Sequence, residues 1–111
     1  MQNTTGEQQK NCTKEKTFQI KNRYNEKIII EEQSNDFKKL LTKNKSKLFE
    51  ADLRKKGLRR IDLREADLRR VDLSDADIWG ANLRKADLWE MVIKEHQILD
   101  LLKSIGVIIK K

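Results

Sequence analysis

At 111 residues the chain has the length of a single domain, and a chain this short buries only a modest core unless its fold is regular. Charged residues make up 39% of the sequence, proline is absent, and the formal net charge is +7. We find no run of about eighteen apolar residues and no basic leader before an apolar segment, so we expect neither a membrane span nor a signal peptide. A cytoplasmic location is expected, and the lone Cys12 agrees with a reducing compartment because it excludes an internal disulfide.

The N-terminal stretch and the residues after it differ in composition. Residues 1–17 contain no aliphatic side chain after Met1, so we expect a flexible polar arm that cannot offset the entropy cost of ordering. Apolar residues then alternate with polar ones on both sides of a polar stretch. This pattern predicts a β-hairpin with the apolar positions Phe18, Ile20, Ile28 and Ile30.

A short helix is expected after the hairpin. Ser34 stands at an N-cap position, and Asp36 falls in the first helical turn. Apolar residues follow at helical spacing, at Phe37, Leu40 and Leu41. We therefore predict a helix over 35–43, and we expect the hairpin and the helix to form one unit over 18–45.

From Ser46 onward the sequence repeats every five residues. The ten pentads are SKLFE, ADLRK, KGLRR, IDLRE, ADLRR, VDLSD, ADIWG, ANLRK, ADLWE and MVIKE. Their third residue is always Leu or Ile, and between residues 51 and 90 the second is Asp or Asn except at Gly57. Over the same range the first residue is small or aliphatic except at Lys56. Internal repetition is therefore the feature that the fold must explain.

This pattern resembles the A(D/N)LXX repeat of the pentapeptide-repeat family, over about half of the chain. The resemblance implies an all-β solenoid: a right-handed quadrilateral β-helix in which each pentad forms one side and four pentads form one coil. The first and third residues then point inward, and residues 46–95 make about two and a half coils. Lys56 takes an inward position, so we expect a local irregularity or an ammonium that escapes past Gly57. The stretch before the repeats also resembles that of some phage-encoded members.

A coil of four pentads places residues twenty apart side by side. Their outward side chains are mostly compatible on this spacing. The predicted ion pairs join Lys55 with Asp75, Glu65 with Lys85, and Arg70 with both Glu50 and Glu90. The predicted cation–π contacts place Arg59 on Trp79, and Arg69 between Phe49 and Trp89.

Residues 96–111 are expected to close the second end of the repeats, as the 18–45 unit closes the first. Apolar residues at helical spacing, Ile98, Leu101, Leu102 and Ile105, predict a capping helix that stops at Gly106. The apolar stretch after Gly106 leaves two alternatives open. It folds back onto the helix, or it forms the C-terminal dimer contact that is known in the family.

The residue types argue against catalysis. The only histidine, His96, and the only cysteine, Cys12, lie in different segments outside the repeats, so no nucleophile pair or metal cluster is expected. The recurrent Asp at the second pentad position is explained by hydrogen bonds to the turn backbone. We therefore expect no enzyme, no catalytic residue, no cofactor, no metal site and no small-molecule substrate.

Five outward residues are candidates for binding a partner. Arg60, Arg64 and Arg84 have no opposite charge twenty residues away, which makes them candidates for binding a phosphate or a carboxylate. Trp79 and Trp89 face outward, and exposed tryptophans are enriched at interfaces. The alternatives are arginines that are merely solvated, and tryptophans that stack on arginine or lie under the C-terminal segment.

Two functions from different classes fit these features. The first is a non-enzymatic scaffold whose rigid sides bind an unidentified protein partner or a second copy in a homodimer. The second is binding of DNA or RNA through the basic arm and the first coil. Residues 51–70 carry eight basic and four acidic side chains, whereas residues 71–90 carry two and five. Acidic members of the family imitate DNA and occupy topoisomerases, but the positive charge here argues against that role. We expect the scaffold and keep nucleic-acid binding as the alternative.

Overall fold

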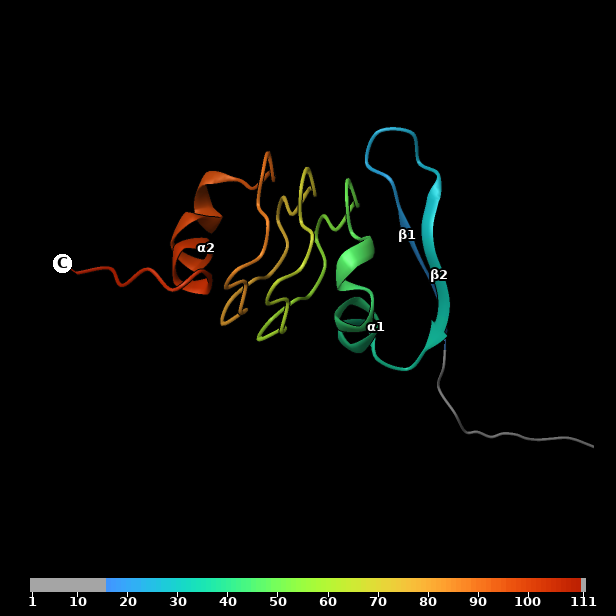
Figure 1. Cartoon of the computed structure of the whole chain (residues 1–111), viewed down its shortest axis with the longest axis horizontal. Coiled ribbons are helices and arrows are strands. Elements are labelled where there is room, and N and C mark those ends of the chain that lie inside the picture. Colours follow the sequence, from blue (N-terminus) through green and yellow to red (C-terminus); the bar gives the residue numbers. More distant parts are fainter. Residues whose placement is uncertain (1–15, 111) are drawn as a thin grey trace, which may run out of the picture.

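The computed structural model describes residues 16–110. Two antiparallel strands, β1 (Lys16–Lys21) and β2 (Ile28–Ser34), precede α1 (Phe37–Lys43), the repeats and α2 (Ile98–Ser104). Short 3₁₀ turns lie at Lys45–Lys47 and Glu95–Gln97. Figure 1 shows the hairpin and α1 at one end of the stacked repeats and α2 at the other. The predicted arm and Cys12 lie outside the described residues, except that residues 16–17 belong to β1.

The predicted hairpin is confirmed, whereas the predicted helix begins later than expected. Ile20 pairs with Ile30 in the hairpin, and both side chains are buried. Asp36 is the N-cap of α1, because its carboxylate accepts two backbone N–H groups of the first turn. The prediction of Ser34 as the cap is wrong: its hydroxyl accepts the N–H of Asp36, just before the helix. Neither helix within residues 16–110 has the length and apolar character needed to cross a bilayer.

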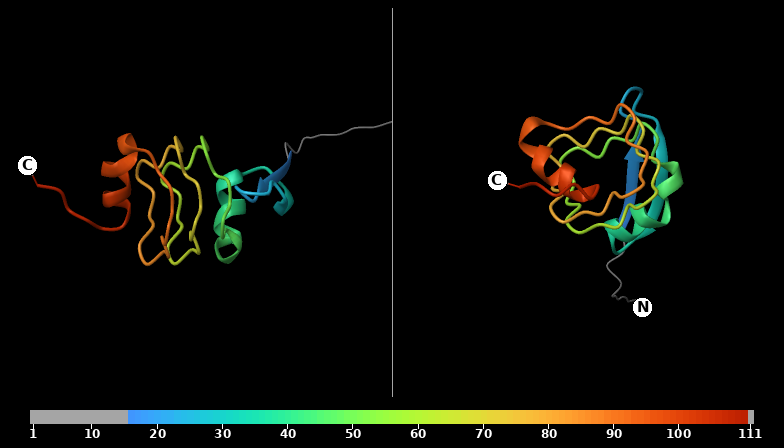
Figure 2. Two further views of the ribbon diagram at one scale, coloured as in Figure 1. Left: turned by 90° about the horizontal axis from the view of Figure 1, so that it is seen from above. Right: turned by 60° about the vertical axis from the view of Figure 1, so that its left-hand side comes forward.

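Parallel bridges join residues that are twenty apart in the repeats. They pair Asp52 with Asp72, Gly57 with Asp77, Asp62 with Asn82, Asp67 with Asp87, and Asp72 with Val92. The predicted twenty-residue spacing is therefore confirmed, since each residue lies beside its counterpart one turn further along the chain. Figure 2 shows these turns stacked along one axis and, in its second view, nearly superimposed. This pairing is that of a β-helix-type fold.

Every corner between pentads has the same backbone geometry. The fifth residue of each pentad from Glu50 to Glu90 has φ between 54° and 71°, and Gly80 is the only glycine among them. At each corner the N–H of the next residue donates to the carbonyl of the third residue, which closes a β-turn, as in Ala51 to Leu48 at 2.9 Å. A positive φ at the third residue of such a turn is the mark of type II. Other residue types tolerate this conformation at a cost of about 1 kcal/mol each.

The Asp and Asn side chains of the second position brace these corners. Each accepts the backbone N–H of the residue two positions later, as Asp62 does from Arg64 at 3.2 Å and Asn82 from Arg84 at 3.2 Å. The same bond occurs in seven pentads, at residues 52, 62, 67, 72, 77, 82 and 87. The predicted backbone role of these residues is therefore confirmed, and it explains why Asp recurs at this position.

The core runs along the inside of the repeats. The third-position residues are buried from Leu48 to Leu83, and most first-position residues of that range are small or aliphatic and buried with them. Lys56 is exposed, with its ammonium 5.4 Å from the centre of the Phe37 ring. Its ammonium has thus left the interior, while the Gly57 bridge beside it is intact. Only the corner bond of Lys56 is long, at 3.4 Å.

The C-terminal segment follows the predicted course as far as its stop. Gly106 has φ of 95° and its N–H donates to the carbonyl of Lys103, while the N–H of Val107 reaches Leu102 at 2.9 Å. This pair of bonds is a Schellman motif, which confirms Gly106 as the helix stop. The side chains after it, Val107, Ile108 and Ile109, are exposed. The alternative in which they fold back onto the helix is therefore wrong.

Candidate functional site

Four of the five candidate binding residues lie on one side of the repeats. The guanidinium of Arg60 lies 5.6 Å from the centre of the Trp79 ring. Trp79 and Arg84 line one surface hollow, and Arg84 and Arg64 line the next. Asn82 lies between these groups and pairs with residue 62 of the neighbouring turn. We call Arg60, Arg64, Trp79, Asn82 and Arg84 the Asn82 face.

Trp89 is separate from this face. It lies ten residues from Trp79, which is half of a twenty-residue turn, and its carbonyl accepts the N–H of Arg70. The exposed fractions of Trp79 and Trp89 are 48% and 59%, so neither ring is covered by the C-terminal segment. The structure thus brings together four candidates and leaves Trp89 at another corner.

Three arginines of the repeats are held by an aspartate of their own pentad. In Arg54, Arg64 and Arg69, Nε and Nη2 donate to the two carboxylate oxygens of the Asp two residues earlier, at 2.9–3.0 Å. The guanidinium of Arg64 holds the pKa of Asp62 far below its usual range. Arg64 has no opposite charge twenty residues away, as expected, but its guanidinium is not free. Its partner lies in the same pentad, because the second and fourth residues both point outward from one corner.

Arg84 differs from these three arginines. Asn82 stands where the aspartate would be, and its amide oxygen lies 3.5 Å from Nη1 of Arg84. No carboxylate among residues 16–110 lies within salt-bridge distance of Arg84. The side chain is exposed and runs beside Gly106, where an added Cβ would lie 3.3 Å from Nε. Arg84 therefore keeps donors free for a ligand.

Arg60 is also without a carboxylate partner in the described part of the chain, and it contacts an aromatic ring instead. Arg59 and Arg60 both place a guanidinium over Trp79, at 5.2 and 5.6 Å from the ring centre. Arg59 also donates to Asp77 at 2.6 Å. The predicted contact between Arg59 and Trp79 is confirmed, with Arg60 as a second cation that the sequence did not indicate.

Further charges surround the Asn82 face. Lys45, Glu65 and Lys85 line the same hollow as Arg64 and Arg84. Lys45 lies 3.6 Å from Asp62, whose oxygens already accept from Arg64. The predicted pair between Glu65 and Lys85 is not formed at salt-bridge distance within the described residues. The hollow therefore carries more positive than negative charge.

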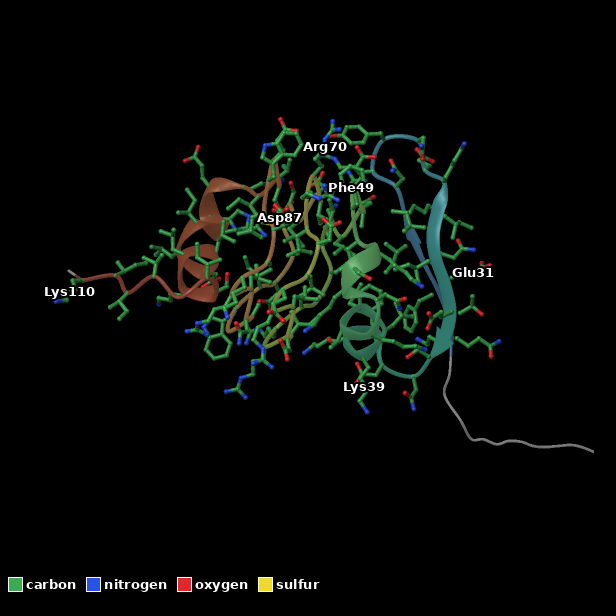
Figure 3. All side chains as sticks on the ribbon, viewed as in Figure 1. Glu31, Lys39, Phe49, Arg70, Asp87 and Lys110 are labelled. Carbon is green, nitrogen blue, oxygen red and sulfur yellow. The ribbon has the colours of Figure 1, made fainter. Side chains whose placement is uncertain are left out.

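The other predicted pairs fare differently. Arg70 binds Glu50 at 3.0 Å and Glu90 at 3.4 Å, as predicted, and it also contacts the hydroxyl of Tyr24 at 3.2 Å. Figure 3 labels Arg70 and Phe49 at this edge of the repeats, and the guanidinium of Arg69 lies 4.9 Å from the centre of the Phe49 ring.

The predicted pair between Lys55 and Asp75 is wrong. Asp75 instead accepts from Lys94 at 2.7 Å and lies 2.9 Å from His96, because the 3₁₀ turn after the repeats brings these two side chains over it. Among residues 16–110, no group of three or more His, Cys, Asp or Glu side chains is arranged to hold a metal ion.

Comparisons with known proteins agree with the repeat. Residues 58–89 match the family model described as pentapeptide repeats, in 8 copies. Neither a curated protein nor a solved structure matches the chain. The family match contains the whole Asn82 face and both partners of two of the five parallel bridges, 62–82 and 67–87.

Proposed function

Because the chain is a pentapeptide-repeat protein over residues 58–89, we propose that it is a non-enzymatic scaffold for protein–protein interaction. In this proposal residues 46–95 form a right-handed quadrilateral β-helix of about two and a half coils. The units 18–45 and 96–111 close its two ends, and the protein is cytoplasmic. A repeat fold of this kind suits binding because a rigid surface loses little conformational entropy when a partner docks.

The Asn82 face is the observation that carries the proposal. It presents Trp79, half exposed, beside Arg60 and Arg84, which lack carboxylate partners among residues 16–110. Aromatic and arginine side chains are the residues that most often dominate protein interfaces. The other repeat arginines are already held by aspartates or, for Arg70, by glutamates, so they offer a partner fewer free donors.

Nucleic-acid binding is the competing function, and the net charge of +7 is the observation in its favour. Its weakness lies in the first coil. There the guanidinium groups of Arg54, Arg64 and Arg69 each bind both oxygens of an aspartate, so much of the positive charge is compensated locally. We therefore place it second.

A homodimer remains part of the proposal for partners. The side chains of Ile98, Leu99 and Ile108 are exposed at the C-terminal end, where a second copy would cover them.

Affinity capture with the immobilised full chain tests the scaffold. We expect R60Q/R84Q to lose a protein partner that the wild type retains at physiological ionic strength. The control R54Q/R69Q removes the same charge from other sides of the repeats and should retain the partner. Equal loss with both double variants would mean that total charge, and not the Asn82 face, causes the binding.

A further inference from the structure

We propose that Arg84, together with Lys45 and Lys85, binds the carboxylates of an acidic peptide segment of a protein partner. The inference rests on the proposed function and names the chemistry of the partner. It follows from a comparison of equivalent arginines within the repeats. The asparagine at position 82 is the feature that makes Arg84 different.

The fourth pentad position shows what an arginine does at a corner. Arg54, Arg64 and Arg69 bind the aspartate of their own pentad. The pentad of Arg59 has Gly57 instead, and Arg59 binds an aspartate of the neighbouring turn at 2.6 Å. Arg84 has no such choice among the described residues. Its own pentad supplies an amide, and the residue eighteen positions further along, which corresponds to the aspartate that Arg59 binds, is Leu102 in α2.

The backbone around Asn82 matches that around Asp62. In both pentads the second-position oxygen accepts the fourth-position N–H at 3.2 Å. The two side chains also lie beside each other across a parallel bridge. The charge of the second residue therefore decides whether the arginine is occupied. With aspartate it is held at 2.9 Å, and with asparagine its nearest oxygen from that side chain is at 3.5 Å.

The surroundings of Arg84 favour a negatively charged ligand. Lys45, Arg64 and Lys85 line the hollow with it, and Glu65 is the only carboxylate among the residues that line this hollow. Arginine binds carboxylates through two parallel N–H···O bonds, and the lysines add positive charge beside it. A carboxylate placed here therefore meets the open guanidinium of Arg84 and the ammonium of Lys85, with the ammonium of Lys45 shared with Asp62 at 3.6 Å.

Two observations favour a peptide over a nucleic acid. Trp79 lies beside Arg84, but the guanidinium groups of Arg59 and Arg60 lie over its ring, which leaves less of the π-face for a stacked base. Glu65 also interrupts the positive surface, whereas a phosphate backbone is followed by a continuous basic groove. A short acidic peptide needs only the local charge of the hollow.

Isothermal titration of the full chain with a blocked peptide of six glutamates tests the site. We expect N82D to weaken peptide binding about tenfold or more, because the new carboxylate occupies Arg84 as Asp62 occupies Arg64. R84Q should weaken it to a similar extent. D62N should strengthen binding, since it frees Arg64. The control N25D adds the same charge in the hairpin turn and should change the affinity less than threefold.

Circular dichroism of each variant confirms that it is folded before the affinities are compared. The proposal is overturned if N82D and R84Q bind the peptide like the wild type, or if N25D weakens binding as much as N82D. It is also overturned if a single-stranded oligonucleotide of equal charge binds more tightly than the peptide and depends on Arg84. Loss of partner capture by R60Q/R84Q without any peptide binding would contradict this site but leave the scaffold function standing.

Discussion

The two ends of the repeat region are closed by different parts of the chain. At the N-terminal end, backbone bonds from Asp52 to Lys21 at 2.8 Å and from Arg23 to Glu50 at 2.8 Å attach the hairpin directly to the first turn. At the C-terminal end, one side chain, that of Gln97, makes several of the hydrogen bonds to the last turn. The comparison teaches that a stack of coils can end by pairing its edge with a strand-like segment, or by bonding to a side-chain amide and to a carbonyl of the capping helix, as the N–H of Leu83 does with Ser104 at 2.9 Å.

Gln97 supplies that amide. Its Nε2 donates to the carbonyls of Leu73 and Ala76 at 2.7 and 2.8 Å, and its Oε1 accepts the N–H groups of Asp75 and Lys94 at 3.2 and 2.8 Å. Two donors and two lone pairs are the full capacity of an amide side chain. Gln97 is only 2% exposed, so these four bonds replace water at the buried end of the coil.

The ends also differ in how deeply they are packed. In α1, Leu40 and Leu41 are buried, whereas in α2 Leu101 and Leu102 are half-buried and Leu99 is exposed. The N-terminal end therefore contributes more apolar burial to stability, and the C-terminal end leaves an apolar surface open.

The largest expected effect comes from removing a leucine at each end. Leu41→Ala should lower the free energy of unfolding by about 2–5 kcal/mol, because Leu41 is fully buried. Leu101→Ala should cost about 1 kcal/mol, since that side chain is only half-buried. Urea denaturation of both variants measures the difference. Equal losses would contradict the unequal packing of the two ends.

A smaller loss is expected from Gln97→Ala. This change leaves the carbonyl of Ala76 and two N–H groups without this partner, while the carbonyl of Leu73 keeps its corner bond from Ala76. The cost is about 1–3 kcal/mol unless water replaces the amide. Hydrogen exchange should show faster exchange at Asp75 and Lys94, whose N–H groups donate to Gln97. Exchange at Asp52, at the other end, serves as the control and should not change.

The smallest expected effect is a pH dependence at the C-terminal end. Hydrogen bonds from Lys94 and His96 hold the pKa of Asp75 below its ordinary value. A carboxylate with a depressed pKa in the folded state stabilises the fold above its unfolded pKa, about 3.9, and this contribution disappears as the pH falls through the folded value. Wild type and D75N should thus differ in thermal midpoint at pH 7 and converge in acid.

At the N-terminal end, Glu32 is the carboxylate to compare with Asp75 in its effect on the pH dependence of stability. Lys43 and Asn44 hydrogen-bond to Glu32 and lower its pKa as well, so E32Q should converge with the wild type in the same direction. A difference between wild type and D75N that grows in acid would contradict the pairing of Asp75 with Lys94 and His96.

The repeat spacing and the inward residues could be predicted from the sequence because Leu or Ile recurs at the third position of every pentad. The positive φ of the corner residues could not be predicted in the same way. Glu50, Lys55 and Arg60 have this conformation, but Glu, Lys and Arg are not residue types that indicate it. The twenty-residue spacing does not indicate the partner of Arg64, because Asp62 lies only two residues away in the same pentad. This contact joins the outward side chains at the second and fourth positions of one pentad, which lie on either side of the inward third residue.

Gln97 shows a different limit of prediction. It is one polar residue beside an apolar helical pattern. The sequence does not indicate that the carbonyls of Leu73 and Ala76 are the groups to which its amide donates. The candidate site was partly predictable, because the outward position of Arg84 follows from the repeat. That its guanidinium is open follows only from the structure, in which Asp62 binds Arg64 and Asn82 does not hold Arg84 in the same way.

The measurement that tests the scaffold function most directly is sedimentation velocity of the full chain, alone and with a short DNA duplex, at low and at physiological ionic strength. We predict a monomer or dimer whose sedimentation does not depend on salt and which leaves the duplex free at physiological ionic strength. A duplex complex that persists there, and whose affinity falls steeply as salt is raised further, would contradict the account. It would assign the positive charge to nucleic-acid binding.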